Sequence, residues 1–315
     1  MTAHPFTVTL LHWYRQHQRA LPWRHSRDPY RIWLAEVIMQ QTRISQGLPY
    51  YQRFIAAYPT LAELAAAPPD EVLRLWQGLG YYSRARHLHK CAQVVWQEHR
   101  GQWPRTAAGL QQLPGIGPYT AAAIAAQAFD EPVPVVDGNV YRVLARHFGL
   151  ATPINTPAAR KEFTTLSASL LNPACPGDYN QALMEFGALQ CTPQKPACDT
   201  CVLALSCVAR QQGRQHELPV KASTRTIRQR YFTYLVVQQN GQLLLRQRPD
   251  GDIWQGLYEF VLIETAQKPE LQKLAHPLLQ QAGHQQAEPI FYRHQLTHRI
   301  LNVNFVAVSV SGPSQ

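Results

Sequence analysis

Four cysteines near the middle of the chain have the spacing C-x6-C-x2-C-x5-C, and they are Cys191, Cys198, Cys201 and Cys207. Four thiolates in one short segment can surround a single metal centre. The unequal gaps differ from the paired C-x2-C spacing of a zinc ribbon. They suit a loop around a cubane, in which each cysteine binds a different iron. The spacing therefore favours a 4Fe–4S cluster as cofactor over a structural zinc or two disulfides.

The N-terminal segment argues against disulfides. Residues 1–20 are polar and basic and lack the long apolar core of a secretory signal. Cys91 and Cys175 lie outside the run, and we expect both to be ordinary buried thiols. No apolar stretch approaches the length of a membrane span. We therefore expect a soluble, cytoplasmic protein without a membrane partner, associated with the nucleoid if the source is bacterial.

Two carboxylates could supply acid–base chemistry. Glu36 is a lone acid in the apolar helical stretch 33–42, where burial should raise its pKa and make it a general acid; the alternative is a core glutamate satisfied by a neighbour. Asp137 follows a strand-like run, 132–136, and precedes a helix from Val140. As an N-cap it would accept backbone N–H bonds and stay ionised. Two acids with separated pKa values suit N-glycosidic bond scission, because one protonates the leaving base while the other stabilises the oxocarbenium-like sugar.

A short glycine-containing segment could bind phosphate. Gly115 and Gly117, in Leu-Pro-Gly-Ile-Gly, are set between helical segments and allow a tight hairpin with positive φ. Such a turn can aim backbone N–H groups outward beside the next helix N-terminus, which binds a phosphate without reading sequence. The alternative is a plain connection between helices.

The charge distribution points to a polyanionic partner. The net charge is +10 and the pI about 9.5. Residues 1–228 carry +9 of this and residues 229–315 only +1, so we expect the phosphate-binding surface on the first part of the chain.

The elements that must position these residues change in type near residue 215. Helical periodicity predicts helices over 29–45, 61–66, 71–78, 83–98, 119–129, 140–148, 158–171 and 178–189. Alternating and β-branched runs predict strands over 231–237, 242–246, 259–264 and 300–310, with one helix over 269–282. The expected fold is multidomain: an all-α domain over 1–212, a linker over 213–228, and a small α+β domain over 229–315.

Together, the cysteine run, the hairpin, the segment 136–139 and the Glu36 helix resemble the helix–hairpin–helix DNA glycosylase superfamily. Within it, Leu-Pro-Trp-Arg (21–24), Gln-Gln-Thr (40–42) and Gly-Leu-Gly-Tyr-Tyr-Ser (78–83) resemble the adenine DNA glycosylases, the MutY family. The resemblance covers most of residues 5–210 and, more loosely, 229–310.

The resemblance implies a monomeric, monofunctional enzyme of base excision repair. It would remove adenine mispaired with 8-oxoguanine or guanine in double-stranded DNA. Glu36 would protonate adenine at N7, Asp137 would stabilise the sugar cation, and Asn139 would position Asp137. Tyr119 stands where bifunctional relatives carry a nucleophilic lysine. A phenol cannot form a Schiff base, so we expect little or no lyase activity and a supporting role beside Asp137.

The resemblance also implies a set of DNA-contacting residues. Gln40 and Tyr81 would wedge into the duplex vacated by the flipped base, next to Gln41 and Thr42. Gly115 and Gly117 would contact the DNA backbone. The residues expected around the flipped base are Arg19, Trp23, Arg24, Met39 and Gln181.

The second domain resembles the Nudix-like C-terminal region of the family, through residues 248–260 and 294–298. No acidic REUXEE helix of Nudix hydrolases is present in the sequence, so we expect recognition rather than hydrolysis. Thr297 and His298 are the candidates for reading 8-oxoguanine, since the Thr297 hydroxyl can donate or accept. The family commonly has Phe-Ser-His where this chain has Leu-Thr-His at 296–298.

Two other functions are compatible with parts of the sequence. One is a non-enzymatic iron–sulfur DNA-binding module, against which the presence of both Glu36 and Asp137 argues. The other is an endonuclease III-like glycosylase/lyase, against which Tyr119 and the second domain argue.

Overall fold

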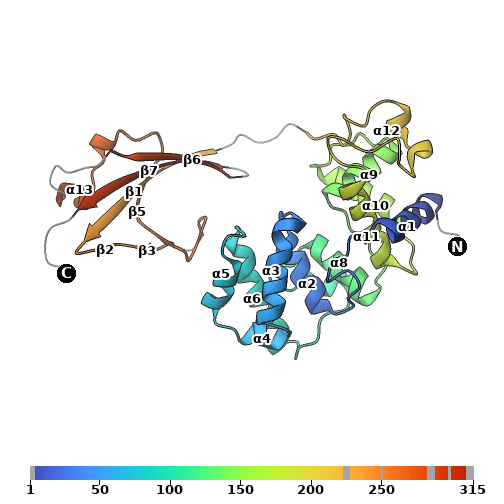
Figure 1. Ribbon diagram of the computed structural model, residues 1–315, viewed down its shortest axis with the longest axis horizontal. Helices are drawn as coiled ribbons and strands as arrows, with labels where there is room; N and C mark the ends of the chain where they lie inside the picture. Colours follow the sequence, from blue (N-terminus) through green and yellow to red (C-terminus); the bar gives the residue numbers. More distant parts are fainter. Residues whose placement is uncertain (1–3, 223–227, 250, 282–287, 297–298, 310–315) are drawn as a thin grey trace. The chain divides into compact units, whose positions relative to one another are not determined.

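The chain forms two compact units, Met1–Ala222 and Ser223–Gln315, in the computed structural model (Figure 1). The structure describes residues 4–222, 228–249, 251–281, 288–296 and 299–309. No helix in these ranges is long and apolar enough to span a membrane.

The first unit is helical. Its helices gather in two lobes, α2 to α6 in one and α1 with α9 to α12 in the other (Figure 1). Each lobe has its own buried core, and α8 packs against both α2 and α11. The helices are α1 (Pro5–His17), α2 (Pro29–Met39), α3 (Ile44–Ala57), α4 (Leu61–Ala66), α5 (Pro69–Trp76), α6 (Tyr82–Gln97), α7 (Ala107–Leu110), α8 (Pro118–Phe129), α9 (Gly138–Phe148), α10 (Pro157–Leu170), α11 (Pro176–Leu189) and α12 (Val208–Gln211), with a 3-10 turn, η1 (Ala204–Ser206).

Local capping explains where several of these helices begin. Asp28 accepts a hydrogen bond from the backbone of Tyr30 ahead of α2, and Pro29 follows it at the first helical position. Thr60 and Glu63 form a reciprocal capping box at α4. Gly149, with φ of 71°, ends α9 in the left-handed conformation that glycine favours.

Several sequence expectations about this unit differ from the structure. The helix predicted over 29–45 ends at Met39, and four helices were not predicted: α1, α3, α7 and α12. The strand-like run 132–136 has no strand partner within the described ranges; it is an extended connection that leads into α9. The predicted linker also begins too early, because residues 213–222 pack on the first unit: Leu218 is buried, its carbonyl accepts from Arg146, and the Val220 carbonyl accepts from Ile154.

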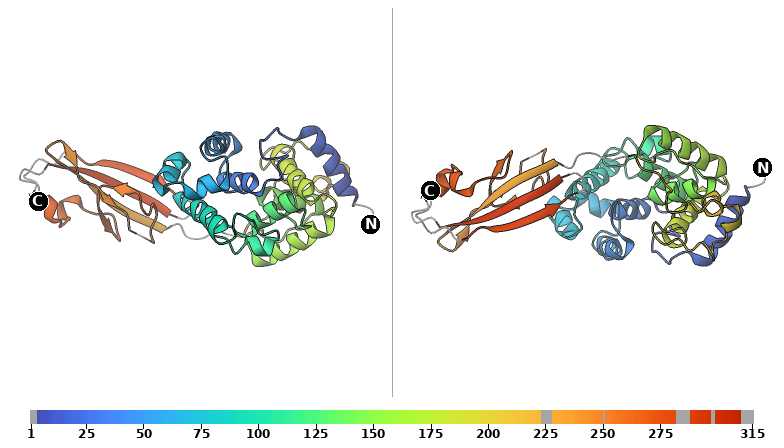
Figure 2. Two further views of the ribbon diagram at one scale, coloured as in Figure 1. Left: turned by 90° about the horizontal axis from the view of Figure 1, so that it is seen from below. Right: turned by 90° about the horizontal axis from the view of Figure 1, so that it is seen from above.

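The second unit is built on a mixed sheet in the order β2-β1-β7-β6, with β5 also paired to β1, plus a separate β3-β4 pair. The two long strands, β1 (Arg228–Gln239) and β7 (Arg299–Ser309), are parallel, and the other pairings are antiparallel. Figure 2 shows these strands side by side, with α13 at one end. The remaining elements are β2 (Gln242–Leu243), β3 (Arg246–Gln247), β4 (Tyr258–Glu259), β5 (Val261–Thr265), η2 (Leu271–Lys273), α13 (Pro277–Gln281) and β6 (Ile290–Gln295).

The expected α+β class is therefore confirmed, with changes in detail. The predicted helix over 269–282 is reduced to η2 and the short α13, and strand β6 was not predicted. A partly buried ion network supports the sheet: Arg248 pairs with Glu259 and with Asp252, and Arg230 pairs with Asp252. The two buried charges, Arg248 and Glu259, are partners of each other, which offsets the cost of their desolvation.

Candidate active site and cysteine loop

Glu36 lies in the last turn of α2 and is 9% exposed. Burial raises the pKa of its carboxyl to about 7; a hydrogen bond from the Tyr119 hydroxyl lowers it in part, and the nearby charge of Asp137 raises it further. A carboxyl with a pKa near 7 is protonated in a large fraction of molecules at neutral pH. The burial expected for Glu36 is present, and its role as a general acid stays a prediction.

Asp137 is the N-cap of α9, as predicted. One carboxylate oxygen accepts from the Val140 backbone at 2.8 Å, and the other accepts from the Asn139 side chain at 2.8 Å. Burial nevertheless raises the Asp137 pKa, while the Val140 and Asn139 hydrogen bonds and the Arg142 charge oppose the rise. The cap alone therefore does not hold the pKa down as expected. Several donors still favour the ionised form.

Tyr119 stands in the first turn of α8, and burial raises the pKa of its hydroxyl well above the usual value. The hydroxyl donates to the sulfur of Met184 at 3.4 Å, and the charges of both Glu36 and Asp137 also raise its pKa. Tyr119 therefore lies near both acids, and its expected support of Asp137 stays a prediction.

Asn139 connects Asp137 to α11 through Arg142. Its side-chain oxygen accepts from Arg142 at 2.9 Å, and Arg142 also donates to the backbone carbonyls of Gly187 and Cys191, each at 2.7 Å. Helix α11 comes close here because Gly187 has no side chain: a Cβ at this position would lie 2.7 Å from the Cβ of Asn139 and 3.0 Å from its backbone oxygen. The Asp137 carboxylate is thus fixed through two helices.

The two segments expected to enter DNA are turns in the lobe that holds Glu36. Gln40 caps the end of α2 and donates to the Thr120 hydroxyl at 3.1 Å, while Gln41 is exposed with φ of 54°. Tyr81 precedes α6 with φ of 50° and is 52% exposed. Thr42 bonds the Gln40 carbonyl at 3.2 Å. One arginine of α6, Arg84, donates to carbonyls of both turns, those of Gln40 and Gly80.

The glycine hairpin joins α7 to α8. Gly115 has φ of 74°, and a Cβ there would lie 2.6 Å from the Cβ of His87, so both conformation and space require glycine. Gly117 is different from the expectation: its φ is −83°, and it serves as the exposed N-cap of α8 with open space around it. The backbone at the start of α8 can approach a ligand closely at this point.

The residues expected around a flipped base divide into two groups. Arg19 and Arg24 both bind Glu185, at 2.6 and 3.0 Å. Although burial would raise it, the hydrogen bonds from Arg19 and Arg24 hold the Glu185 pKa at about 2. Gln181, one turn earlier on α11, donates to Gln127 at 3.2 Å. Arg24 and Gln181 line the same pocket.

Trp23 and Met39 pack in the core of the Glu36 lobe and are not among the residues that line that pocket. Trp23 is buried and packs edge-on against Tyr51, and Met39 packs against the same core beside Gly47. Thr297 and His298 lie outside the described residues, so their expected role stays a prediction.

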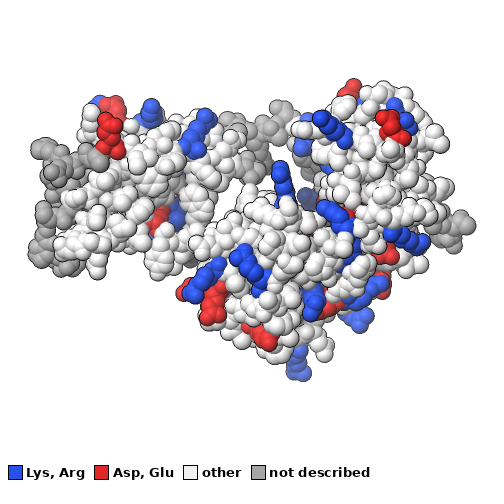
Figure 3. Space-filling model, in the orientation of Figure 1, with Lys and Arg blue, Asp and Glu red and all other residues white. Residues whose placement is uncertain are grey.

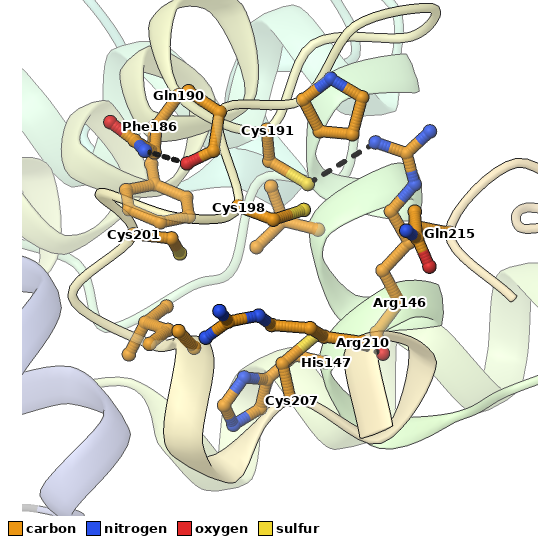
Figure 4. A pocket seen from close by; sticks show the side chains of 15 residues that line it. Arg146, His147, Phe186, Gln190, Cys191, Cys198, Cys201, Cys207, Arg210 and Gln215 are labelled. Atoms are coloured by element: carbon orange, nitrogen blue, oxygen red, sulfur yellow. Dashed lines mark hydrogen bonds between the residues drawn. The ribbon is translucent and has the colours of Figure 1, made fainter. Parts of the chain in front are cut away.

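The four cysteines of the run line one pocket at the side of α9 (Figure 4). None of the cysteines within the described ranges is in a disulfide, and no three His, Cys, Asp or Glu side chains there are arranged to hold a single metal ion. Apolar side chains complete the wall, among them Phe186 and Leu203. A pocket with thiols spread over its wall suits a polynuclear group, in which each cysteine binds a different iron.

Arg146 holds the beginning of this loop. Its guanidinium lies 3.4 Å from the sulfur of Cys191 and donates to the carbonyls of Thr192 and Pro193 at 2.7 and 2.8 Å. These bonds fix the backbone on which Cys191 stands. Arg142 and Arg146 are one turn apart on α9, so one helix supports both Asn139 and the cysteine loop.

Four residues that support the site were not predicted from the sequence: Glu185, Arg84, Arg142 and Arg146. Arginines four apart on a helix are a weak signal for the last two. The basic surface was expected, and Figure 3 shows Lys and Arg side chains spread over the visible face of the first unit, with fewer acidic ones.

Comparison with known proteins defines the class. Residues 34–168 match the family model of the HhH-GPD superfamily base excision DNA repair proteins, and residues 233–315 match the NUDIX domain model. The solved structure of a thermostable thymine-DNA glycosylase superposes with a TM-score of 0.61 at 31% identity, covering 66% of this chain and 95% of that one. An endonuclease III–DNA complex, at 22% identity and a TM-score of 0.56, shares the fold. The chain is thus a helix–hairpin–helix DNA glycosylase with a Nudix-like second domain.

Curated relatives narrow the class further. The adenine DNA glycosylase of Mus musculus is 37% identical over 95% of this chain and 70% of its own length; that of Buchnera aphidicola subsp. Acyrthosiphon pisum is 32% identical over 82% and 75%. The chain spans 64% of the rat relative and 59% of the human one. The chain belongs to the adenine DNA glycosylase family.

Proposed function

We propose that this DNA glycosylase removes adenine mispaired with 8-oxoguanine or guanine in double-stranded DNA, as a monofunctional enzyme. The observation that carries the proposal is the pair of unlike acids at the junction of α2, α8 and α9. Glu36 has a pKa of about 7, and Asp137 lies close enough to affect it. Family membership supports adenine as the base that is released.

Glu36 delivers the proton. Adenine becomes a good leaving group when it is protonated at N7, and a neutral buried carboxyl beside the flipped base can supply that proton. Tyr119 lies beside the Glu36 carboxyl and can donate a hydrogen bond to it. Because Tyr119 is not an amine, the site has no Schiff-base nucleophile at this position, which supports base release without strand cleavage.

Asp137 stabilises the sugar cation. As the bond to adenine breaks, positive charge develops on the deoxyribose, and an adjacent carboxylate lowers the energy of that state. Asn139 and the Val140 backbone fix both oxygens of the carboxylate. A group held in this way needs little reorganisation during the reaction.

The four-cysteine pocket supports a 4Fe–4S cluster as cofactor. Cys191, Cys198, Cys201 and Cys207 would hold it, and when bound it would give the loop a fixed shape for docking on DNA phosphates. The hairpin at Gly115 offers a second phosphate contact through backbone N–H groups beside α8.

The test is incubation of the purified enzyme with duplexes that contain adenine opposite 8-oxoguanine, guanine or thymine. Base release and strand nicking are scored separately, the first after alkaline cleavage of the abasic product. We expect release opposite 8-oxoguanine and guanine, little opposite thymine, and no nicking without alkali. Nicking that keeps pace with release would favour the endonuclease III-like alternative. No release from any duplex would favour the non-enzymatic one.

A further inference from the structure

Two turns of the Glu36 lobe, 40–42 and 78–81, have unusual backbone conformations. Gln41 and Tyr81 both have positive φ without being glycines, and Gly78 and Gly80 flank Leu79 with φ of 92° and 75°. For residues other than glycine, a left-handed conformation costs roughly 1 kcal/mol or more. Such turns keep one shape only when surrounding contacts fix them.

Arg84, on the first turns of α6, supplies those contacts. Its Nη1 donates to the carbonyls of Val37 and Ile38 at 3.1 Å each and to that of Gln40 at 2.6 Å. Its Nη2 donates to the Gly80 carbonyl at 3.4 Å. One guanidinium thus joins the last turn of α2, which carries Glu36, to the turn that carries Tyr81.

Arg84 also contacts two aromatic rings next to these turns. The guanidinium carbon lies 5.1 Å from the centre of the Trp76 ring and 5.6 Å from that of Tyr81. Trp76 also donates to the Gly80 carbonyl at 2.9 Å. The planar group therefore holds Tyr81 both through its ring and through the carbonyl that precedes it. A lysine ammonium, a single point of charge, cannot make this set of contacts at once.

Arg84 lies at the C-terminal end of α2, where burial lowers the pKa of its guanidinium to about 10. The last carbonyls of a helix lack partners within the helix and attract cations. The groups that shift the Glu36 pKa are its burial, Tyr119 and Asp137. Arg84 donates to backbone carbonyls of both turns, so its effect is on their placement.

We infer that Arg84 is a positioning residue that fixes the turns 40–42 and 78–81 as one rigid wedge for insertion beside the orphan base. The inference rests on the proposed function, since it requires that adenine is flipped. The wedge compensates for the stacking lost when adenine leaves the duplex. Loss of Arg84 therefore matters most when adenine starts out paired.

The first experiment compares Arg84→Lys with the wild type in single-turnover base release. Adenine is placed either opposite guanine or opposite a tetrahydrofuran abasic analogue, where it has no pairing partner. We expect a rate roughly tenfold lower on the paired adenine and less than about threefold lower on the unpaired one, since unstacking costs a few kcal/mol. Arg105→Lys is the matched control, because Arg105 also lies over a ring, that of Phe129, at 5.3 Å. It should leave both rates unchanged.

The second experiment separates this inference from the proposed function, because it needs no base release. With 2-aminopurine as the target base, the fluorescence gained on binding reports unstacking. We expect a smaller gain for Arg84→Lys and for Tyr81→Ala. The fluorescence gain of the double variant should equal that of the more impaired single variant, because Arg84 acts through Tyr81. The pH profile of base release should not move.

Iron content and thermal unfolding check that Arg84→Lys folds. If it does not fold, Gly80→Ala disturbs the same turn. A Cβ at Gly80 meets no other atom, but the φ of 75° is strained for alanine. This variant should show the same dependence on pairing. Equal losses on paired and unpaired adenine, or additive effects of the Arg84 and Tyr81 changes, would overturn the inference.

Discussion

Replacing Glu36 with glutamine should slow catalysis and, above neutral pH, stabilise the protein. Glutamine keeps the size and polarity of the side chain but has no proton to deliver, so base release should fall by about two orders of magnitude or more. Binding to the mispaired duplex should persist, because phosphate contacts do not depend on that proton.

The effect on stability follows from the raised pKa. The Glu36 carboxyl has a pKa of about 7 in the folded protein and an ordinary value of 4.5. At about 1.4 kcal/mol for each tenfold change, this difference corresponds to roughly 3 kcal/mol. The stability linked to the neutral carboxyl is fully present below pH 4.5 and is lost as pH rises through about 7. Glutamine does not titrate, so Glu36→Gln avoids that loss.

The assay is thermal unfolding of both proteins at pH 5 and pH 8. The melting temperature of Glu36→Gln relative to wild type should rise by several degrees between the two pH values, since 1 kcal/mol corresponds to about 2–4 °C in a unit of this size. Glu98→Gln, which changes an exposed carboxylate in the same unit, is the control and should show no such rise. The same difference at both pH values, or base release by Glu36→Gln at the wild-type rate, would refute the reasoning.

Three further predictions concern other parts of the chain. Glu185→Gln should lower the stability of the first unit by about 3–5 kcal/mol, because it leaves Arg24 buried without its charged partner. Thermal unfolding measures this loss. In the wild type, the same stabilisation should be lost as pH falls from the ordinary glutamate range toward about 2. Elemental analysis of anaerobically purified protein should find about four irons per chain, and one zinc without sulfide would contradict the cluster. Removal of residues 223–315 should leave an enzyme that still releases adenine opposite guanine, while its preference for 8-oxoguanine falls by about 1–3 kcal/mol, the range of one good base contact; undiminished preference would place lesion reading in the first unit.

The sequence predicted those site residues whose signal is local. A lone acid in an apolar helix marks Glu36, and a polar residue just before a helix marks Asp137. The cysteine spacing is likewise readable within one short segment. Each of these depends on residues a few positions apart, which periodicity and capping rules can detect.

The parts that escaped prediction depend on partners far apart in the chain. Arg24 meets Glu185 across 161 positions, and Arg84 meets Val37 across 47. No local pattern links such pairs. Strand β6 was missed for a related reason: all six of its residues are exposed, so it lacks the alternation of buried and exposed positions that marks a strand. Helix α3 has a glycine and a proline inside it, which read as a break.

The close approach of Gly187 to Asn139 has a genetic consequence. Any missense change of a glycine codon introduces a residue with a Cβ. At this point of α11 there is no room for a Cβ. Every missense change at position 187 must therefore displace the residue that holds Asp137, however conservative the new side chain is. Position 187 contributes no atom to the chemistry, yet it should be as intolerant of inherited variation as the catalytic acids themselves.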